Sequence, residues 1–192
     1  MSQARVVIAE DEAIIRLDLK ELLEEEGYEV VGETGRGDEA VELVRELKPD
    51  LAILDIKMPG LDGLTAARHI VGERLAAVLI LTAFSQRDLV EQARDAGAIG
   101  YIVKPFQKSD LIPAIEVALG RHKELEDLAR DIGDLKDRLE GRKVMDRAKG
   151  ILRDDAGLSE DEAFTFLRKA AMDRRTKVEV VAQMVVDGSL TP

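Results

Sequence analysis

The chain has no cysteine and no tryptophan, and aromatic residues make up only 3% of its 192 residues. Without cysteine, neither a disulfide framework nor a thiolate metal site can form. Long apolar runs are also missing, since none approaches the roughly 20 residues that cross a bilayer. The opening residues, MSQARVV, do not resemble a secretory signal. We therefore expect a soluble, cytoplasmic protein with no membrane partner.

Positive charge is scarce as well, with 28 basic against 39 acidic residues and a formal net charge of -11. Such a balance argues against a general nucleic-acid coat protein. The deficit is uneven, because residues 1–120 hold 23 acidic and 13 basic side chains, whereas residues 121–192 hold 16 and 15. Within residues 141–177, ten basic side chains outnumber seven acidic ones. A modest basic segment therefore lies inside an acidic protein.

Five short apolar runs alternate with helical patterns in the first 120 residues. The runs read RVVIA, YEVVG, LAILD, AAVLIL and GYIV. Helical spacing of apolar residues separates them, over 13–26, 38–47, 64–72 and 87–96, with a last pattern starting near Ser109. Strands that alternate with helices predict βαβ units, and near-continuous apolar runs fit strands covered on both faces. We therefore predict an α/β fold, a doubly wound parallel sheet of five strands.

The helical pattern that starts near Ser109 continues far beyond the sheet. Ser109 is expected to cap it, with Pro113 tolerated only in the first turn. Five apolar residues follow at spacings of 3, 4, 3 and 4: Leu125, Leu128, Ile132, Leu135 and Leu139. This heptad seam spans about two repeats, fewer than the three or four that define a coiled coil. Two interpretations stay open, a connector helix that covers its own domain and a seam between two copies.

The last 50 residues predict a small all-α domain of three helices. The first covers RKVMDRAKGILRD. The second is expected to open at Ser159 and the third at Thr176, because each is followed three residues later by glutamate, the pattern of a capping box. Phe164 and Phe166 are expected to pack in the core. We expect this domain to follow the long linker helix.

Carboxylates follow two of the predicted strands. Glu10 and Asp11 come directly after the first strand, and Asp55 ends the third. In a doubly wound sheet, ligands bind beyond the carboxyl ends of the strands, where the strand order reverses. Three like charges in one shallow pocket are unfavourable unless a cation neutralises them. Mg²⁺ suits such a pocket, because it prefers hard oxygen ligands and keeps several waters.

Two further strand ends complete this pattern. The fourth strand ends at Thr82, which offers a hydroxyl, and the fifth is followed by Lys104, which offers a cation. A carboxylate nucleophile, a divalent cation, a hydroxyl and a lysine together suit phosphoryl transfer. Helix capping or a surface position would explain any one of these residues alone. Five matching residues at four strand ends, in order along the chain, favour a phosphoryl site.

On these motifs, residues 4–122 resemble the receiver domain of two-component response regulators, a flavodoxin-like fold. The resemblance implies that Asp55 accepts a phosphoryl group from a sensor histidine kinase. It also implies that the backbone carbonyl of Lys57 joins Glu10, Asp11 and Asp55 as an Mg²⁺ ligand. Thr82 and Lys104 would contact the phosphoryl group, and Tyr101 matches the switch aromatic of the family. The peptide bond between Lys104 and Pro105 is usually cis in this family.

The residues beside the phosphoacceptor favour slow loss of the phosphoryl group. Lys57 and Phe84 each follow a site residue by two positions and would flank the path of an attacking water. A haloacid-dehalogenase-like phosphatase is an alternative, but such enzymes carry an acid–base aspartate where this chain has Lys57. We therefore do not expect an enzyme, beyond phosphorylation of its own Asp55 and slow dephosphorylation.

The final helix is a poor candidate for reading DNA. Its polar face offers Lys177, Glu179, Gln183 and Asp187, which is too acidic for a recognition helix in the major groove. The basic side chains lie on the first tail helix and around the end of the second. A tail that binds a protein partner or DNA remains an alternative.

The tail instead resembles an ANTAR domain, an RNA-binding antitermination module, over residues 136–188. The resemblance is carried by Ala148-Lys149-Gly150, Glu162-Ala163, Ala170-Ala171-Met172 and Val181-Ala182. It implies recognition of paired RNA stem-loops and a homodimer favoured by phosphorylation. Our candidates for RNA contact are basic residues together with one glycine: Lys149, Gly150, Arg142, Arg147, Arg174 and Arg175.

The sequence thus predicts three segments. Residues 1–122 form a phosphoacceptor receiver domain, residues 123–140 a linker helix with a coiled-coil seam, and residues 141–192 an ANTAR-like domain. The expected function is phosphorylation-controlled transcription antitermination.

Overall fold

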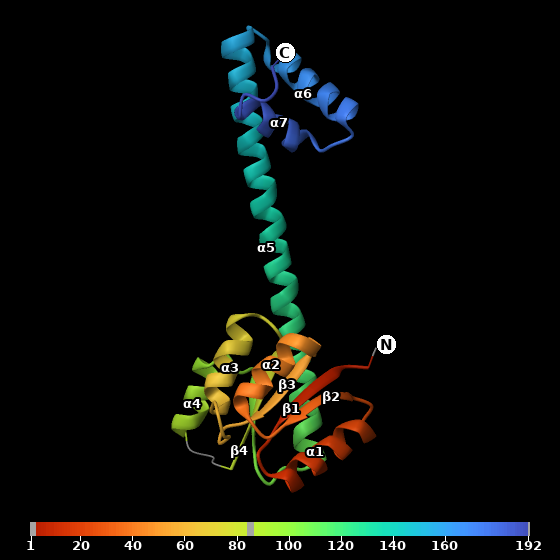
Figure 1. The fold of residues 1–192 in the computed structure, drawn as a ribbon, viewed down its shortest axis with the longest axis vertical. Helices are drawn as coiled ribbons and strands as arrows, with labels where there is room; N and C mark the ends of the chain where they lie inside the picture. Colours follow the sequence, from red (N-terminus) through yellow and green to blue (C-terminus); the bar gives the residue numbers. More distant parts are fainter. Residues whose placement is uncertain (1–2, 84–86, 192) are drawn as a thin grey trace. The chain divides into compact units, whose positions relative to one another are not determined.

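The computed structural model describes residues 3–83 and 87–191 of the chain. The chain divides into two compact units, Met1–Glu126 and Asp127–Pro192. The boundary falls within one helix, α5 (Lys108–Ala156), which is drawn in green to blue in Figure 1.

The first unit is built on five parallel strands in the order β2-β1-β3-β4-β5. The strands are β1 (Arg5–Ala9), β2 (Glu29–Thr34), β3 (Leu51–Asp55), β4 (Ala77–Thr82) and β5 (Gly100–Val103). The order reverses at β1, because the chain adds β2 on one side of it and β3 on the other. The predicted doubly wound α/β fold is confirmed, and β1 and β3 are neighbours at the point of reversal.

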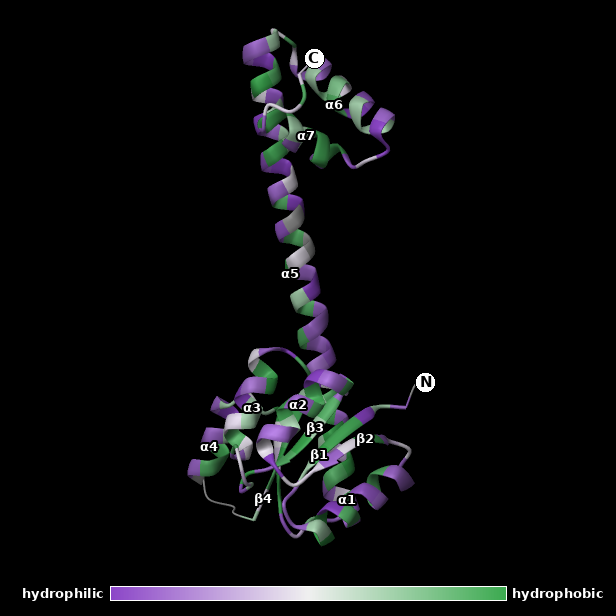
Figure 2. Cartoon of the chain, in the orientation of Figure 1, coloured by the Kyte–Doolittle hydropathy of each residue, from purple (hydrophilic) through white to green (hydrophobic). Residues whose placement is uncertain are grey.

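Two cores cover the two faces of this sheet. The helices of the unit are α1 (Ala13–Glu25), α2 (Gly37–Leu47), α3 (Gly63–Gly72), α4 (Arg87–Asp95) and the first turns of α5. Val7 and Ala9 of β1 pack toward α2, α3 and α4, whereas Val6 and Ile8 pack toward α1 and α5. The central strands are correspondingly hydrophobic along their length, while the helices carry both hydrophilic and hydrophobic residues (Figure 2).

The long helix α5 differs from the prediction at its start and at its end. It begins at Lys108, so Ser109 lies inside the helix and does not cap it. The backbone N–H of Gln107 instead donates to Asp110 Oδ2 (3.2 Å), and Pro113 lies beyond the first turn. The helix then runs to Ala156, so the predicted first tail helix is the end of α5. The glycines inside α5 do not interrupt it. Each lowers helix stability by up to about 1 kcal/mol relative to alanine, and the surrounding residues with high helix propensity offset this loss.

The second unit packs α6 (Glu160–Arg174) and α7 (Val178–Val186) against the end of α5. Its core consists of small and aliphatic side chains: Ala148, Leu152, Ala163, Leu167, Ala170, Ala171, Val181, Ala182 and Val185. The prediction that Phe164 joins this core is wrong, because its side chain is 46% exposed. Phe166 does pack against the core.

One of the two predicted capping boxes is present. Ser159 Oγ accepts from the backbone N–H of Glu162 and the Glu162 carboxylate accepts from the backbone N–H of Ser159, which confirms the prediction for α6. The prediction for Thr176 is wrong, since α7 has Lys177 at its N-cap and no side-chain cap. The Thr176 N–H donates to the carbonyl of Ala171 (3.0 Å), so this residue closes α6 and the next helix starts one residue later.

Candidate functional site

Three carboxylates meet at the point where the strand order reverses. Glu10 follows β1, Asp11 comes next, and Asp55 is the last residue of β3. One oxygen of each lies within 4.8 Å of the others. Glu10 and Asp55 are buried, whereas Asp11 is exposed. The cluster is therefore open to solvent on one side only.

Lys104 is the buried cation of this cluster. Its ammonium lies 2.5 Å from Glu10 Oε2 and 3.3 Å from Asp55 Oδ1. Burial raises the pKa of the Glu10 carboxyl, and the ammonium opposes this effect. Burial likewise raises the pKa of Asp55 against the pull of Lys104. Among the described residues, Lys104 thus pairs with two buried carboxylates beside a third at the rim, an arrangement that favours a further cation.

One oxygen of Glu10 supports the same conclusion. Oε2 is buried and, among the residues that the structure describes, accepts no hydrogen bond of ordinary geometry, although the Lys104 ammonium is close. An oxygen-rich, acidic cluster with such an acceptor fits a hard divalent cation such as Mg²⁺.

The other predicted site residues lie along the same edge of the sheet. Thr82 is the buried last residue of β4, and Lys57 follows β3 by two residues. Tyr101 lies on β5 with its side chain 42% exposed. Phe84 lies outside the described residues. The Lys104–Pro105 peptide bond is cis, which confirms the expectation from the resemblance.

A pocket of about 720 Å³ opens beside this cluster, between the loop that follows β3 and helix α4. The residues that line it include Asp11 of the cluster together with Lys57, Met58, Leu89 and Gln92. The exposed side of the cluster is therefore accessible to a phosphate-bearing partner.

Two glycines that the sequence analysis did not single out hold the loops of the site together. A Cβ on Gly63 would lie 1.8 Å from the backbone oxygen of Asp55, and one on Gly37 would lie 2.0 Å from that of Leu61. The N–H of Gly37 also donates to the carbonyl of Pro59 (3.1 Å). Only glycine allows such close backbone contacts. A single sequence gives no signal that separates these glycines from others in loops.

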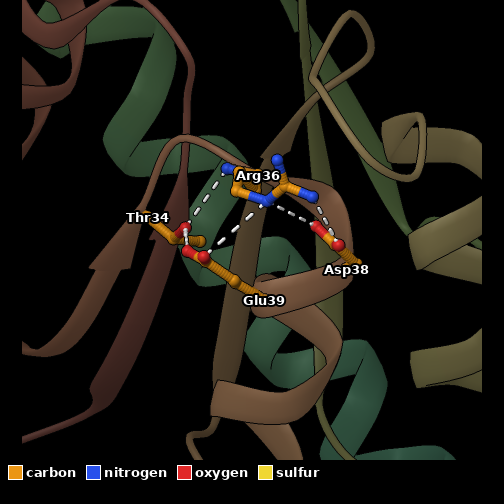
Figure 3. Close-up of polar contacts among 4 residues, drawn as sticks. All are labelled: Thr34, Arg36, Asp38 and Glu39. Atoms are coloured by element: carbon orange, nitrogen blue, oxygen red, sulfur yellow. Dashed lines mark hydrogen bonds and ion pairs between the residues drawn. The ribbon is translucent and has the colours of Figure 1, made fainter.

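The loop between β2 and α2 is fixed by a polar network around Arg36 (Figure 3). The Arg36 guanidinium donates to both carboxylate oxygens of Asp38 (3.0 and 2.7 Å) and lies 3.7 Å from Glu39. Thr34 Oγ1 donates to Glu39 (2.6 Å) and accepts from the Arg36 backbone N–H (3.1 Å). The network orders the loop that carries Gly37, and through Gly37 it supports the loop that follows Asp55.

In the second unit, the predicted RNA contact Lys149 is already engaged. Its ammonium lies 2.9 Å from Glu160 and 3.3 Å from Asp146. Hydrogen bonds that the ammonium donates to the carboxylates of Glu160 and Asp146 raise the pKa of Lys149. Gly150 beside it faces open space, since a Cβ there would meet no atom within 4 Å. Glu160 is eleven residues away in sequence, so helical spacing does not indicate this pairing.

The four remaining candidates fall into two groups. Arg142 and Arg147 are exposed on α5 and form no ion pair within the described part of the chain. Arg174 and Arg175 lie at the C-terminal end of α6, where cations complement the helix dipole. Arg174 donates to the carbonyl of Ala170 (3.4 Å), and Arg175 takes the left-handed cap position. The two arginines of α5 are therefore the freer group.

Comparison with known families defines the class of protein. Residues 6–116 match the response regulator receiver domain, and residues 133–186 match the ANTAR domain. The chain therefore belongs to the response regulators that combine a receiver domain with an ANTAR domain.

Individual relatives agree with this assignment. The chain is 56% identical over 188 residues to the transcriptional regulatory protein PdtaR of Mycobacterium tuberculosis, a match that covers 98% of this chain and 92% of that protein. It is 42% identical over 112 residues to the chemotaxis protein CheY of Thermotoga maritima, covering 58% and 93%. Among solved structures, the receiver domain of the putative response regulator NarL from Mycobacterium tuberculosis aligns with a TM-score of 0.60 at 30% identity, covering 62% of this chain and 98% of that one. No helix among the described residues is long and apolar enough to cross a membrane.

Proposed function

We propose that this response regulator binds structured RNA stem-loops and acts in transcription antitermination, under the control of phosphorylation at Asp55. The observation that carries the proposal is the ANTAR match over residues 133–186. The helices of that region expose arginines to solvent, and Arg142 and Arg147 lack ion pairs within the described residues. Guanidinium groups can follow phosphates and stack on loop bases. A nascent RNA target implies that the protein acts in the cytoplasm.

Phosphoryl transfer begins at the Asp55 carboxylate. One of its oxygens attacks the phosphorus of a phosphohistidine on a sensor histidine kinase, and the imidazole nitrogen leaves with the electrons of the broken P–N bond. Glu10, Asp11, Asp55 and the backbone carbonyl of Lys57 would hold Mg²⁺, which neutralises charge on the phosphoryl oxygens when bound. The ammonium of Lys104, now shared by two carboxylates, would then pair with the new phosphate.

The conformational change after phosphorylation would involve residues of the neighbouring strands β4 and β5. Thr82 would donate to a phosphoryl oxygen, and Tyr101, half-exposed on β5, would turn inward as Thr82 moves. We also propose that the chain does not turn over as a phosphatase, because Lys57 stands where an acid–base aspartate would be needed. An acyl-phosphate lifetime of only seconds would contradict this part of the proposal.

A dimer would carry the signal to the tail. Helix α5 presents an apolar seam of five residues that are each more than half exposed: Leu125, Leu128, Ile132, Leu135 and Leu139. Their heptad spacing suits the same seam of a second copy. A change of about 5.5 kcal/mol in the free-energy difference between two states moves their populations from 1:99 to 99:1. Phosphorylation therefore need stabilise the dimer by only a few kcal/mol.

Retention of nucleic acid by the purified protein tests the proposal. A pool of structured RNAs and a duplex DNA are each applied with and without beryllofluoride, which occupies the phosphoryl position on Asp55. We expect RNA retention that rises on activation, with no rise in the Asp55→Asn variant. Retention of duplex DNA alone would favour a DNA-binding regulator, and retention of neither would favour a protein partner.

A further inference from the structure

A groove of about 790 Å³ runs along the second unit where the end of α5 meets the start of α7. Arg138, Arg142 and Met145 line it from α5, at spacings of four and three that place them on one face of the helix. Lys177, the N-cap residue of α7, and Glu179 in its first turn line the other side. Pockets of roughly 300–1,000 Å³ accommodate small organic ligands, so the groove is large enough for a nucleotide.

The charged side chains that line the groove differ in whether they form ion pairs. Two of its acids are engaged, since Glu140 lies 2.7 Å from Lys143 and Asp146 lies 3.3 Å from Lys149. Arg142 and Lys177 have no ion pair among the residues that the structure describes. The rim of the groove therefore carries an excess of positive charge, which suits phosphate.

The floor of the groove has the opposite character. Val144 and Met145 line the groove, and both side chains also pack against the hydrophobic core of the unit. A thioether makes favourable contacts with aromatic rings. An apolar floor beneath a cationic rim matches a nucleotide, which joins a flat base to a charged phosphate. In a duplex the bases are stacked and paired, whereas loop bases can be splayed out.

We propose that this groove binds one unpaired nucleotide from an RNA loop. The base lies against Val144 and Met145, and the flanking phosphates contact Arg142 and Lys177. This proposal rests on the proposed function, that the tail binds RNA, and names the site where recognition of the loop occurs. Lys149 lines the same groove but is held by two carboxylates, so the expected centre of the interface is the face of α5 that carries Arg142.

A substitution of Glu179 tests the same proposal, because it should strengthen RNA binding where the loss of Arg142 weakens it. It is the acid of the groove for which the described residues provide no ion pair, and its side chain lies over Gly141, whose added Cβ would be 3.1 Å from Glu179 Cγ. A negative charge at this position repels phosphate. The Glu179→Gln variant keeps the shape of the side chain and removes the charge, so it should bind RNA more tightly.

The experiment uses the full chain activated with beryllofluoride and Mg²⁺, and one hairpin RNA recovered from a random-loop pool on the wild-type protein. Arg142→Gln should weaken binding about tenfold and reduce the salt slope of log K by about 0.7, as loss of one single-strand phosphate contact predicts. Glu179→Gln should tighten binding several-fold. Arg168→Gln is the matched control, because Arg168 is an exposed arginine on α6 outside the groove. Circular dichroism melts establish that each variant is folded.

A fluorescent base analogue, 2-aminopurine, placed in turn at each loop position tests the base contact. One position should change its emission on binding, and Arg142→Gln should abolish the change. If the wild type binds the hairpin but Arg142→Gln and Glu179→Gln behave like Arg168→Gln, the groove is not the site while RNA binding stands. If salt slopes shift but no loop position reports, the base contact is overturned. If the wild type retains no RNA, the proposed function fails and this inference fails with it.

Discussion

Each unit of the molecule contains a lysine held between two carboxylates, and the two lysines differ in their surroundings. Lys104 lies between Glu10 and Asp55 with 9% of its side chain exposed. Lys149 lies between Asp146 and Glu160 with 21% exposed, and its partners are largely in solvent. Strand ends that the fold must bring together create the first cluster. Helix surfaces create the second. The receiver site is therefore buried and strongly coupled, whereas the tail cluster is a solvated surface pairing.

The largest expected effect comes from removing each lysine in turn. Lys104→Met leaves buried carboxylates without their cation, and loss of one partner from a buried ion pair costs about 3 kcal/mol or more of unfolding free energy. Lys149→Met removes a solvated pairing, so its effect should be far smaller. Urea denaturation of both variants in chelator measures the difference.

Added Mg²⁺ sharpens this comparison. A divalent cation held by Glu10, Asp11 and Asp55 would replace the missing ammonium charge. Mg²⁺ should therefore recover part of the stability that Lys104→Met loses relative to the wild type, and it should leave the difference in stability between Lys149→Met and the wild type unchanged. Equal losses in chelator, or equal recovery with Mg²⁺, would contradict the difference between the two clusters.

The next effect comes from the two ends of α3. A Cβ on Gly63, the first residue of the helix, would clash with the backbone oxygen of Asp55, whereas one on Gly72, the last residue, would meet no atom within 4 Å. Gly63→Ala should cost about 2–3 kcal/mol through overpacking, and Gly72→Ala should be neutral or slightly stabilising. Thermal melts measure the stability of both variants. Because the clash falls on Asp55, the proposed phosphoacceptor, Gly63→Ala should also slow its phosphorylation, and normal phosphorylation in a destabilised variant would contradict that link.

The receiver unit was the more predictable of the two for a physical reason. Buried parallel strands read as apolar runs, and the residues that follow them must share one edge of the sheet, so the order Glu10, Asp55, Thr82, Lys104 alone indicates a cluster. Distances within it, such as the closer approach of Lys104 to Glu10 than to Asp55, depend on side-chain conformations. Those do not follow from strand order.

The tail was less predictable because helix surfaces impose no such order. Lys149 was favoured as an RNA contact, but its engagement by Glu160 depends on how α6 packs against α5. The groove around Arg142 arises from the same packing. Similarly, both Phe164 and Phe166 were expected in the core, but only Phe166 packs against it, because the direction of each side chain depends on how α6 packs.

A smaller effect concerns the contact that attaches α5 to the receiver. Tyr28 is buried and its hydroxyl donates to Glu116 of α5 (2.5 Å). Burial and the neighbouring Glu116 carboxylate raise the pKa of the phenol above its ordinary value. Because the folded-state pKa is the higher one, the stabilisation is fully present below about pH 10 and is lost as the pH rises through the folded-state pKa. Tyr28→Phe should cost about 1 kcal/mol at neutral pH and remove this alkaline loss.

Unfolding free energies measured from pH 7 to 11 check this expectation. Tyr101→Phe is the matched control, since Tyr101 is 42% exposed. If Tyr28→Phe and the wild type lose stability in parallel above pH 10, the buried hydrogen bond does not contribute as the structure indicates.

The smallest effect separates the two capping patterns that looked alike in the sequence. Ser159→Ala removes a side-chain acceptor from the start of α6 and should cost about 1 kcal/mol. Thr176→Ala removes no cap, because Lys177 holds the N-cap position of α7, so the change should stay within a few tenths of a kcal/mol. Urea denaturation followed at the transition of the second unit compares the two. A loss for Thr176→Ala as large as for Ser159→Ala would mean that α7 starts one residue earlier in solution, with Thr176 as its cap and Lys177 displaced from the rim of the groove.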